Sequence, residues 1–214
     1  MPNNTTQKPE IIYFYDALCG WCYGFSTVIS KLHEKYKSEI DFQVVSGGMI
    51  LGNRIGPIGE AAPYIKWAYK EVEEKTGIKF GRNFLEVLNN GNTIFTSLPA
   101  AMAMSVFKEL DQQNQIPFSQ AIQKTIYYEG KDPANLQTFI DLVSEFNIDK
   151  QKFTAKINSQ KAIDLAHIDF SLTQSLSVNG FPTIVLNYNN QQQIIARGYV
   201  AYPVLDQIIS NLKL

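Results

Sequence analysis

The chain has 214 residues, of which 45% are hydrophobic and 18% are charged, and its formal net charge is −1 at pH 7. This composition is typical of a globular protein that buries a substantial core, as one domain or as one domain with a large insertion. The charge gives no basis for binding nucleic acid or an anionic membrane surface, and no apolar run reaches the roughly 20 residues of a spanning helix. We therefore expect neither nucleic acid nor a membrane as a partner.

The N-terminal segment, MPNNTTQKPE, is polar. It lacks the basic region, the apolar region and the small-residue cleavage site of a secretory signal peptide. We therefore expect a cytoplasmic protein, although a chain that had lost its signal peptide would have the same sequence and would be periplasmic.

The predicted elements begin with a β-α-β unit. Residues 11–16, IIYFYD, form a short aromatic and β-branched run, which predicts a strand buried on both faces. Residues 41–46, DFQVVS, predict a second strand. Between them, apolar positions at helical spacing predict a helix of about four turns. These positions are Phe25, Val28, Ile29, Leu32 and Tyr36. Strand, helix and strand so close in sequence indicate two parallel strands with a right-handed connection.

A helical block follows, with helices expected in the segments 61–77, 97–110, 117–130 and 132–146. In the last of these segments, Asp132 is the candidate N-cap and Pro133 the first helical residue. A further helix is expected over residues 160–178, and it would end at Asn179-Gly180, a typical C-cap sequence.

The end of the chain returns to strands. Residues 182–188 and 192–197 flank a polar Asn189-Asn190 turn, which predicts a β-hairpin. A final amphipathic helix follows, with Pro203 near its first turn. The order is therefore β-α-β, a helical block, and then β-β-α, which places the chain in the α/β class.

Both cysteines of the chain, Cys19 and Cys22, lie in the segment LCGWC, where the first predicted strand meets the first helix. A disulfide between them would close almost no chain, so its effect on stability would be small. A structural zinc ion needs four ligands, and the only histidines, His33 and His167, are 134 positions apart in helical segments. We therefore expect no metal site within one chain, while a zinc site shared by the cysteine pairs of two chains stays open.

Thiol chemistry is the interpretation that fits the cysteine pair best. The helix dipole and the unpaired backbone N–H groups at a helix start favour the thiolate of the first cysteine. Cys19 is therefore the expected nucleophile, and Cys22 is the expected resolving thiol that releases a mixed disulfide. Asp16 either tunes the thiols and relays a proton to Cys22, or hydrogen-bonds backbone N–H groups in the turn.

Other residues near the motif have two interpretations each. Trp21 is either a substrate-contacting aromatic on an exposed turn or a side chain packed against the helical block. The segment Gly47-Gly48-Met49 favours a structural turn over a binding turn at the active face. Arg54 is a candidate contact for an anion such as a glutathione carboxylate, although an isolated arginine in a loop is more often solvated.

The segments YDALCGWCYGF, VVSGGM and NGFPTIVL resemble those of a known family. The chain is similar to the DsbA-like thioredoxin-fold oxidoreductases, and within them to the FrnE-like branch, which is described as protein disulfide isomerases. The resemblance covers most of the chain in order and is weak through the helical block. It implies a thioredoxin fold, formed by residues 9–55 and 166–214, that is interrupted by a large inserted α-helical domain at 56–165.

The resemblance also implies roles for individual residues. Phe181, Pro182 and Thr183 match the position where thioredoxin-like folds place a cis-proline opposite the cysteine pair, against an extended substrate, so we expect a cis Phe181–Pro182 bond. Gly20 and Trp21 replace the Pro-His pair of typical DsbA oxidants, which argues against strong oxidant behaviour. The implied substrates are protein or small-molecule disulfides and dithiols. No metal or organic cofactor is implied, and glutathione is a candidate redox partner.

We therefore predict a thiol–disulfide oxidoreductase of the reductase, isomerase or oxidase type. A reducing cytosol would keep the pair as a dithiol, which favours the reductase or isomerase direction. One alternative is a glutathione-dependent enzyme resembling the kappa-class transferases and 2-hydroxychromene-2-carboxylate isomerases, which typically carry a serine and no C-x-x-C pair. The other alternative is a non-catalytic binding module on a thioredoxin-like scaffold.

Overall fold

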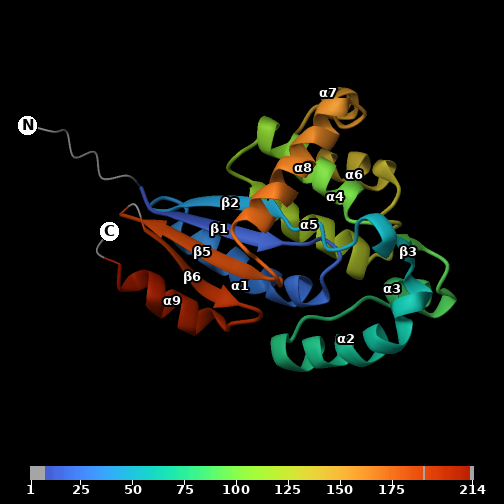
Figure 1. Ribbon diagram of the computed structural model, residues 1–214, viewed down its shortest axis with the longest axis horizontal. Coiled ribbons are helices and arrows are strands. Elements are labelled where there is room, and N and C mark those ends of the chain that lie inside the picture. Colours follow the sequence, from blue (N-terminus) through green and yellow to red (C-terminus); the bar gives the residue numbers. More distant parts are fainter. Residues whose placement is uncertain (1–7, 190, 213–214) are drawn as a thin grey trace, which may run out of the picture.

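The computed structural model describes residues 8–189 and 191–212. At its centre is a four-stranded sheet with the strand order β2-β1-β5-β6 (Figure 1). The strands of this sheet are β1 (Glu10–Tyr15), β2 (Asp41–Ser46), β5 (Thr183–Tyr188) and β6 (Gln191–Arg197). β1 runs parallel to β2 and antiparallel to β5, and β5 and β6 form an antiparallel hairpin. The predicted parallel β-α-β unit and the late hairpin are confirmed, while Asn190 of the predicted turn lies outside the described residues.

The helices of the described residues fall into two groups by position. Those outside the central block, which pack on the sheet, are α1 (Gly20–Tyr36), α8 (Gln160–Ser175) and α9 (Tyr202–Ser210). Those of the central block are α2 (Ala62–Thr76), α3 (Arg82–Asn90), α4 (Leu98–Leu110), α5 (Gln115–Tyr127), α6 (Leu136–Leu142) and α7 (Lys150–Ile157). Short 3-10 helices occur at Gly52–Arg54, Ile58–Ala61 and Val143–Phe146, and a small hairpin pairs β3 (Gly56–Pro57) with β4 (Ile94–Phe95).

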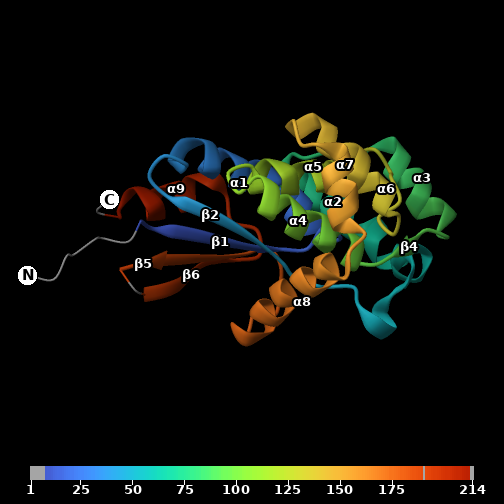
Figure 2. The same ribbon diagram turned by 90° about the horizontal axis from the view of Figure 1, so that it is seen from above.

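β1 is buried on both faces, as its apolar sequence predicts. Successive side chains of a strand point to opposite faces. Ile11, Tyr13 and Tyr15 belong to the larger core that includes α1 and α9, whereas Ile12 and Phe14 pack with residues of α8 and the segment after it. Figure 2 shows α1 and α9 on one side of the sheet and α8 on the other. The central sheet with helices on both faces is therefore the thioredoxin fold that the sequence predicts.

The central helical block contacts the sheet helices at the end of the sheet where β1 runs into α1 (Figure 1). α2 and α5 pack against α1, and α4 packs against α8. The start of α1 is therefore enclosed between the sheet and the block. The proposed division of the chain into two domains remains a prediction, and its boundary at residue 166 lies within α8.

A buried ion pair holds the C-terminal end of β2. Lys108 Nζ of α4 lies 2.8 Å from Asp169 Oδ2 of α8 and donates to the Val44 carbonyl at 3.0 Å. The same carboxylate oxygen accepts the Ser46 N–H at 3.0 Å. Both the side-chain pair and the strand backbone are thereby satisfied, and β2 ends in a fixed position just before Gly47.

Two predicted helix ends are wrong. α6 begins after Asn135, whose side chain accepts the Gln137 N–H, while Asp132 instead accepts the Ala134 N–H in the preceding turn at 2.9 Å. Aspartate and asparagine cap equally well, so the pattern alone does not choose between the two sites.

The predicted C-terminal end of α8 is also wrong. This helix stops at Ser175 rather than at Asn179-Gly180, because the chain reverses at Ser177, which has a φ of 52°. Asn179 and Gly180 therefore lie in the loop that leads to Phe181. The sequence also did not predict α3 or α7.

No helix within residues 8–189 and 191–212 is both long enough and apolar enough to cross a membrane.

Candidate active site

Cys19 occupies the N-cap position of α1. Its backbone is extended (φ −93°, ψ 110°), and its Sγ accepts the backbone N–H of Cys22 at 3.3 Å. An N-cap side chain normally supplies an oxygen to the free N–H groups of the first turn, and here a sulfur takes that place. The helix start therefore directs a hydrogen-bond donor and a positive partial charge at the Cys19 sulfur.

The two thiols differ in their access to solvent. Both cysteines are free, with Cys19 7% exposed and Cys22 fully buried. Burial raises the pKa of the Cys22 thiol well above its usual value, and the neighbouring Cys19 raises it further. Cys22 therefore keeps its proton in the resting dithiol, and an approaching substrate meets Cys19 first.

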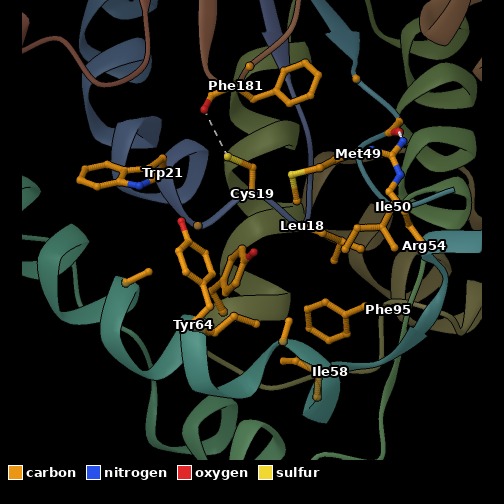
Figure 3. A pocket seen from close by; sticks show the side chains of 18 of the residues that line it. Leu18, Cys19, Trp21, Met49, Ile50, Arg54, Ile58, Tyr64, Phe95 and Phe181 are labelled. Atoms are coloured by element: carbon orange, nitrogen blue, oxygen red, sulfur yellow. Dashed lines mark hydrogen bonds between the residues drawn. The ribbon is translucent and has the colours of Figure 1, made fainter.

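The loop before β5 packs directly on Cys19. The Phe181–Pro182 peptide bond is cis, as predicted, and the Cys19 thiol donates to the Phe181 carbonyl at 3.5 Å (Figure 3). The Pro182 carbonyl accepts the Gly198 N–H at 2.8 Å, and the Thr183 hydroxyl donates to the Gly180 carbonyl at 2.8 Å. Phe181 is thus the residue of the predicted trio that contacts Cys19 Sγ, while the other two residues shape the loop.

The Phe181 ring is packed against the loop after β2. A Cβ placed on Gly47 would lie 2.1 Å from Cζ of that ring, so the ring fits only because residue 47 is glycine. Gly48 has a φ of +68°, a backbone conformation that glycine adopts without strain. The glycine pair therefore forms a close-packed turn that seats a residue in contact with Cys19, and the pair also lines the cavity beside that cysteine.

Asp16 connects three segments behind the cysteine turn. Its Oδ1 accepts the Leu18 N–H at 2.9 Å and the Ser97 hydroxyl at 3.0 Å, and its Oδ2 accepts the Met49 N–H at 2.7 Å. Burial raises the pKa of the Asp16 carboxyl, and these hydrogen bonds partly oppose that rise. Asp16 thus acts as an acceptor for backbone N–H groups, which is one of its two predicted roles.

Two residues behind the site were not predicted from the sequence. Ser97, expected only as the start of a helix, donates to Asp16 and accepts the Ile50 N–H at 2.9 Å. Gln123 of α5 is fully buried, and its amide contacts the Asp16 carbonyl at 3.4 Å. The Ser-Leu-Pro sequence at the start of α4 was a signal for a cap at Ser97, but no local pattern indicates which distant residue that hydroxyl meets.

A cavity of about 650 Å³ opens beside Cys19, between the cysteine turn and the central block. Aromatic and aliphatic side chains form most of its wall, with Arg54 at one side and Tyr64, Phe95 and Ile58 opposite Cys19 (Figure 3). The Arg54 guanidinium lies 3.4 Å from the Gly48 carbonyl and faces the same cavity. The cavity is large enough for a small thiol or a substrate side chain.

Trp21 faces both the cavity and the central helical block. It lines the cavity, and its ring lies 6.4 Å from that of Tyr199. Lys75 of α2 places its Nζ 5.4 Å from the Trp21 ring, within the range of a cation–π contact. Gly20, the other residue between the cysteines, also lines the cavity. Of the predicted site residues, Cys19, Gly20, Trp21 and Phe181 meet at this cavity, and Asp16, Cys22, Pro182 and Thr183 are buried beside it.

The histidines lie outside the site. His33 of α1 packs edge-on against Phe42 of β2, and His167 packs edge-on against Phe170, both in α8. Across the described ranges, no group of three or more His, Cys, Asp or Glu side chains could hold a metal ion. A dithiol transfers electrons through its own sulfur atoms.

A thioredoxin fold with a free dithiol at the start of its first helix, opposite a cis-proline, defines a thiol–disulfide oxidoreductase. Residues 10–209 match the model of the DSBA-like thioredoxin domain family, and the chain belongs to this family.

Solved structures share the fold over nearly the whole chain. A candidate protein disulfide isomerase from Nitrosomonas europaea is 23% identical, with a TM-score of 0.81 over 95% of this chain and 97% of that one. The cytosolic disulfide reductase DsbM from Pseudomonas aeruginosa is 25% identical, with a TM-score of 0.74 over 87% and 89% of the two chains. Its structure with GSH matches at 23% identity, with a TM-score of 0.78 over 96% and 100%.

One relative is described as an adapter protein and not as an oxidoreductase. The ClpXP adapter protein SpxH of Bacillus licheniformis is 18% identical over 210 residues, which are 96% of this chain and 68% of that protein.

Proposed function

We propose that this protein reduces or isomerises disulfides of protein or small-molecule substrates in the cytoplasm, with glutathione as its redox partner. The observation that carries the proposal is the asymmetry of the dithiol. Cys19 lies at the helix start beside an open cavity, while Cys22 is fully buried behind it. We place the protein in the FrnE-like branch on the strength of its CGWC and GFPT segments.

The proposed reaction has two thiol exchanges. The Cys19 thiolate attacks one sulfur of a substrate disulfide, forming a mixed disulfide, and the other substrate sulfur leaves as a thiol after taking up a proton. The Cys22 thiolate then attacks Cys19 Sγ, so that the second substrate thiol leaves and the Cys19–Cys22 disulfide remains. The substrate gains two electrons and two protons, and two molecules of glutathione restore the dithiol as they become glutathione disulfide.

The proposed binding mode uses the loop before β5 and the cavity. The Phe181 carbonyl accepts the Cys19 thiol in the resting state and is released when that thiol ionises. We assign Phe181, Pro182 and Thr183 to contacts with the substrate backbone, and Trp21 to its side chains. For glutathione, the Arg54 guanidinium at the cavity wall is the candidate partner of a carboxylate. The GSH complex of DsbM, a protein of the same fold, supports glutathione as the ligand.

The test measures the reduction of a protein disulfide, such as those of insulin, with glutathione as the reductant. We expect turnover in the wild type, none in Cys19→Ser, and a trapped mixed disulfide in Cys22→Ser that mass spectrometry detects. Turnover that survives Cys22→Ser on a non-disulfide substrate would favour the transferase or isomerase alternative. Intact binding of partner proteins without any turnover in the wild type would favour a non-catalytic module.

The glutathione assignment has its own control. Arg54→Gln should raise the KM for glutathione about tenfold, because a hydrogen bond between charged groups contributes about 1.4 kcal/mol. Arg82→Gln removes an exposed guanidinium that pairs with Glu86 in α3 outside the cavity, and it should leave the KM unchanged. Equal values for the two variants would contradict the assignment. A redox titration against glutathione then gives the direction of the reaction in a named compartment.

A further inference from the structure

Two buried tyrosines in β1 leave their hydroxyls unpaired. Tyr13 and Tyr15 are 0% and 1% exposed, and within the described part of the chain neither hydroxyl has a hydrogen-bond partner of ordinary geometry. A buried polar group without a partner costs about 1–3 kcal/mol. Phenylalanine, as at Phe14 of the same strand, would pack in the same way without that cost. The Tyr13 hydroxyl therefore calls for an explanation beyond packing.

The Tyr13 side chain faces the first turns of α1. Its ring lies 5.9 Å from that of Phe25, which is on the same side of α1 as Cys22, three residues earlier. The pKa of Tyr13 is raised by burial, and next by the charge of Cys22 and of Cys19. The Cys22 side chain is also close enough for hydrogen bonding to add to this rise. The unpaired Tyr13 hydroxyl and the Cys22 side chain therefore belong to the same buried cluster, between β1 and α1.

Cys22 needs a hydrogen-bond donor when its thiol ionises to resolve the mixed disulfide. Its thiol must ionise before it can attack Cys19, yet burial opposes a negative charge at this position. A hydrogen bond donated to the thiolate would lower the cost of that charge without admitting water.

The other ionisable groups around Cys22 are less suited to this role. These groups are Cys19, Asp16, Tyr15 and Tyr127. Cys19 is itself bonded to the substrate at that stage. The Asp16 carboxyl oxygens already accept hydrogen bonds from the Leu18 and Met49 N–H groups and from the Ser97 hydroxyl. The Tyr15 hydroxyl is instead close to the Ser46 side chain, although neither of these hydroxyls is paired within the described residues, and Tyr127 lines the cavity.

We propose that the Tyr13 hydroxyl donates a hydrogen bond to the Cys22 sulfur as this thiol ionises, and so sets the rate at which the mixed disulfide is resolved. The inference rests on the proposed function of the cysteine pair. In this step the Cys22 thiol gives up one proton, equal in number to the proton that the leaving substrate sulfur takes up, and the resulting thiolate forms a bond to Cys19 Sγ. The bond between Cys19 and the substrate sulfur breaks, and that sulfur leaves with the electron pair and takes up a proton. Tyr13 keeps its own proton throughout.

The test separates the two exchange steps with a chromogenic aromatic disulfide, 5,5′-dithiobis(2-nitrobenzoate). The reduced protein releases one coloured thiolate when Cys19 forms the mixed disulfide and a second one when Cys22 resolves it. In Tyr13→Phe we expect an unchanged first phase and a second phase slowed about tenfold, with its pH midpoint moved upward. Tyr15→Phe is the matched control, because it removes an equally buried and unpaired hydroxyl from the same strand. Its second phase should equal that of the wild type.

The other possible outcomes would overturn either the role of Tyr13 alone or both proposals. An unchanged second phase in Tyr13→Phe, or equal slowing in both variants, would overturn the role of Tyr13 while leaving the proposed function intact. Release of only one equivalent by the wild type would overturn the resolving role of Cys22, and with it both proposals. Titration of the single thiol in Cys19→Ser, with and without Tyr13→Phe, gives a readout that does not depend on turnover. The proposal requires a higher pKa of Cys22 in the double variant.

Discussion

Gly47→Ala tests how the loop after β2 positions the active site. The added Cβ would lie 2.1 Å from Phe181 Cζ, whereas ordinary contacts begin near 3.4 Å, so the ring must move by about 1.3 Å. Residue 47 cannot retreat easily, because its N–H donates to the Tyr15 carbonyl at 2.7 Å. The displacement therefore falls on Phe181, whose carbonyl accepts the Cys19 thiol at 3.5 Å.

The expected effect has a stability part and an activity part. Overpacking of this kind costs typically about 1–3 kcal/mol, which urea unfolding measures as a lower midpoint at unchanged slope. Loss of the fixed Phe181 carbonyl should also lower kcat/KM for disulfide reduction about tenfold, equivalent to about 1.4 kcal/mol of transition-state stabilisation. Gly180→Ala is the control variant, because a Cβ at Gly180 meets no heavy atom within 4 Å.

A double-mutant cycle decides whether the Phe181 ring transmits the effect. In a Phe181→Ala background, the added methyl group at residue 47 has no ring to displace, and its cost should fall below about 0.5 kcal/mol. If the cost of Gly47→Ala were the same in both backgrounds, the ring would not be the element that carries the perturbation, and the reasoning would be refuted.

Two further predictions concern buried carboxylates. Because burial raises the pKa of Asp16, its contribution to stability is gained as the pH falls through the folded-state pKa and lost as the pH rises. The unfolding free energy of Asp16→Asn should therefore fall further below that of the wild type between pH 7 and about 4, and a constant difference would contradict this. Asp169→Asn leaves Lys108 without its buried partner and should cost about 3 kcal/mol in denaturant unfolding. Asp141→Asn breaks an exposed pair and should cost under about 1 kcal/mol; similar costs for the two would argue against a buried-pair effect.

The sequence predicted those parts of the fold and the site that depend on local patterns. The continuous apolar run of β1 predicts a strand covered on both faces, and the structure places helices on both. The cysteine pair falls at a strand-to-helix corner, and Cys19 is indeed the N-cap of α1. The cis Phe181–Pro182 bond also follows the predicted pattern, because the residues around it match a known family.

The parts that were missed depend on distant contacts. Ser97 meets Asp16 across 81 positions of the chain, and Gln123 meets it across 107. Hydrophobic periodicity reports which face of an element is buried, but it does not report which partner lies there. It also does not distinguish a buried tyrosine from a phenylalanine, so the hydroxyl of Tyr13 became visible only in the folded chain.

The hydrogen bond between Cys19 and the Phe181 carbonyl joins residues that are 162 positions apart. A ribosome adds about 5–20 residues each second, so the cysteine pair is synthesised about 10–30 s before the loop that covers it. During that interval the thiols of the newly synthesised segment are covered neither by the cis-proline loop nor by the complete helical block. Exchange with cellular thiols in this period would leave adducts that the completed fold then encloses.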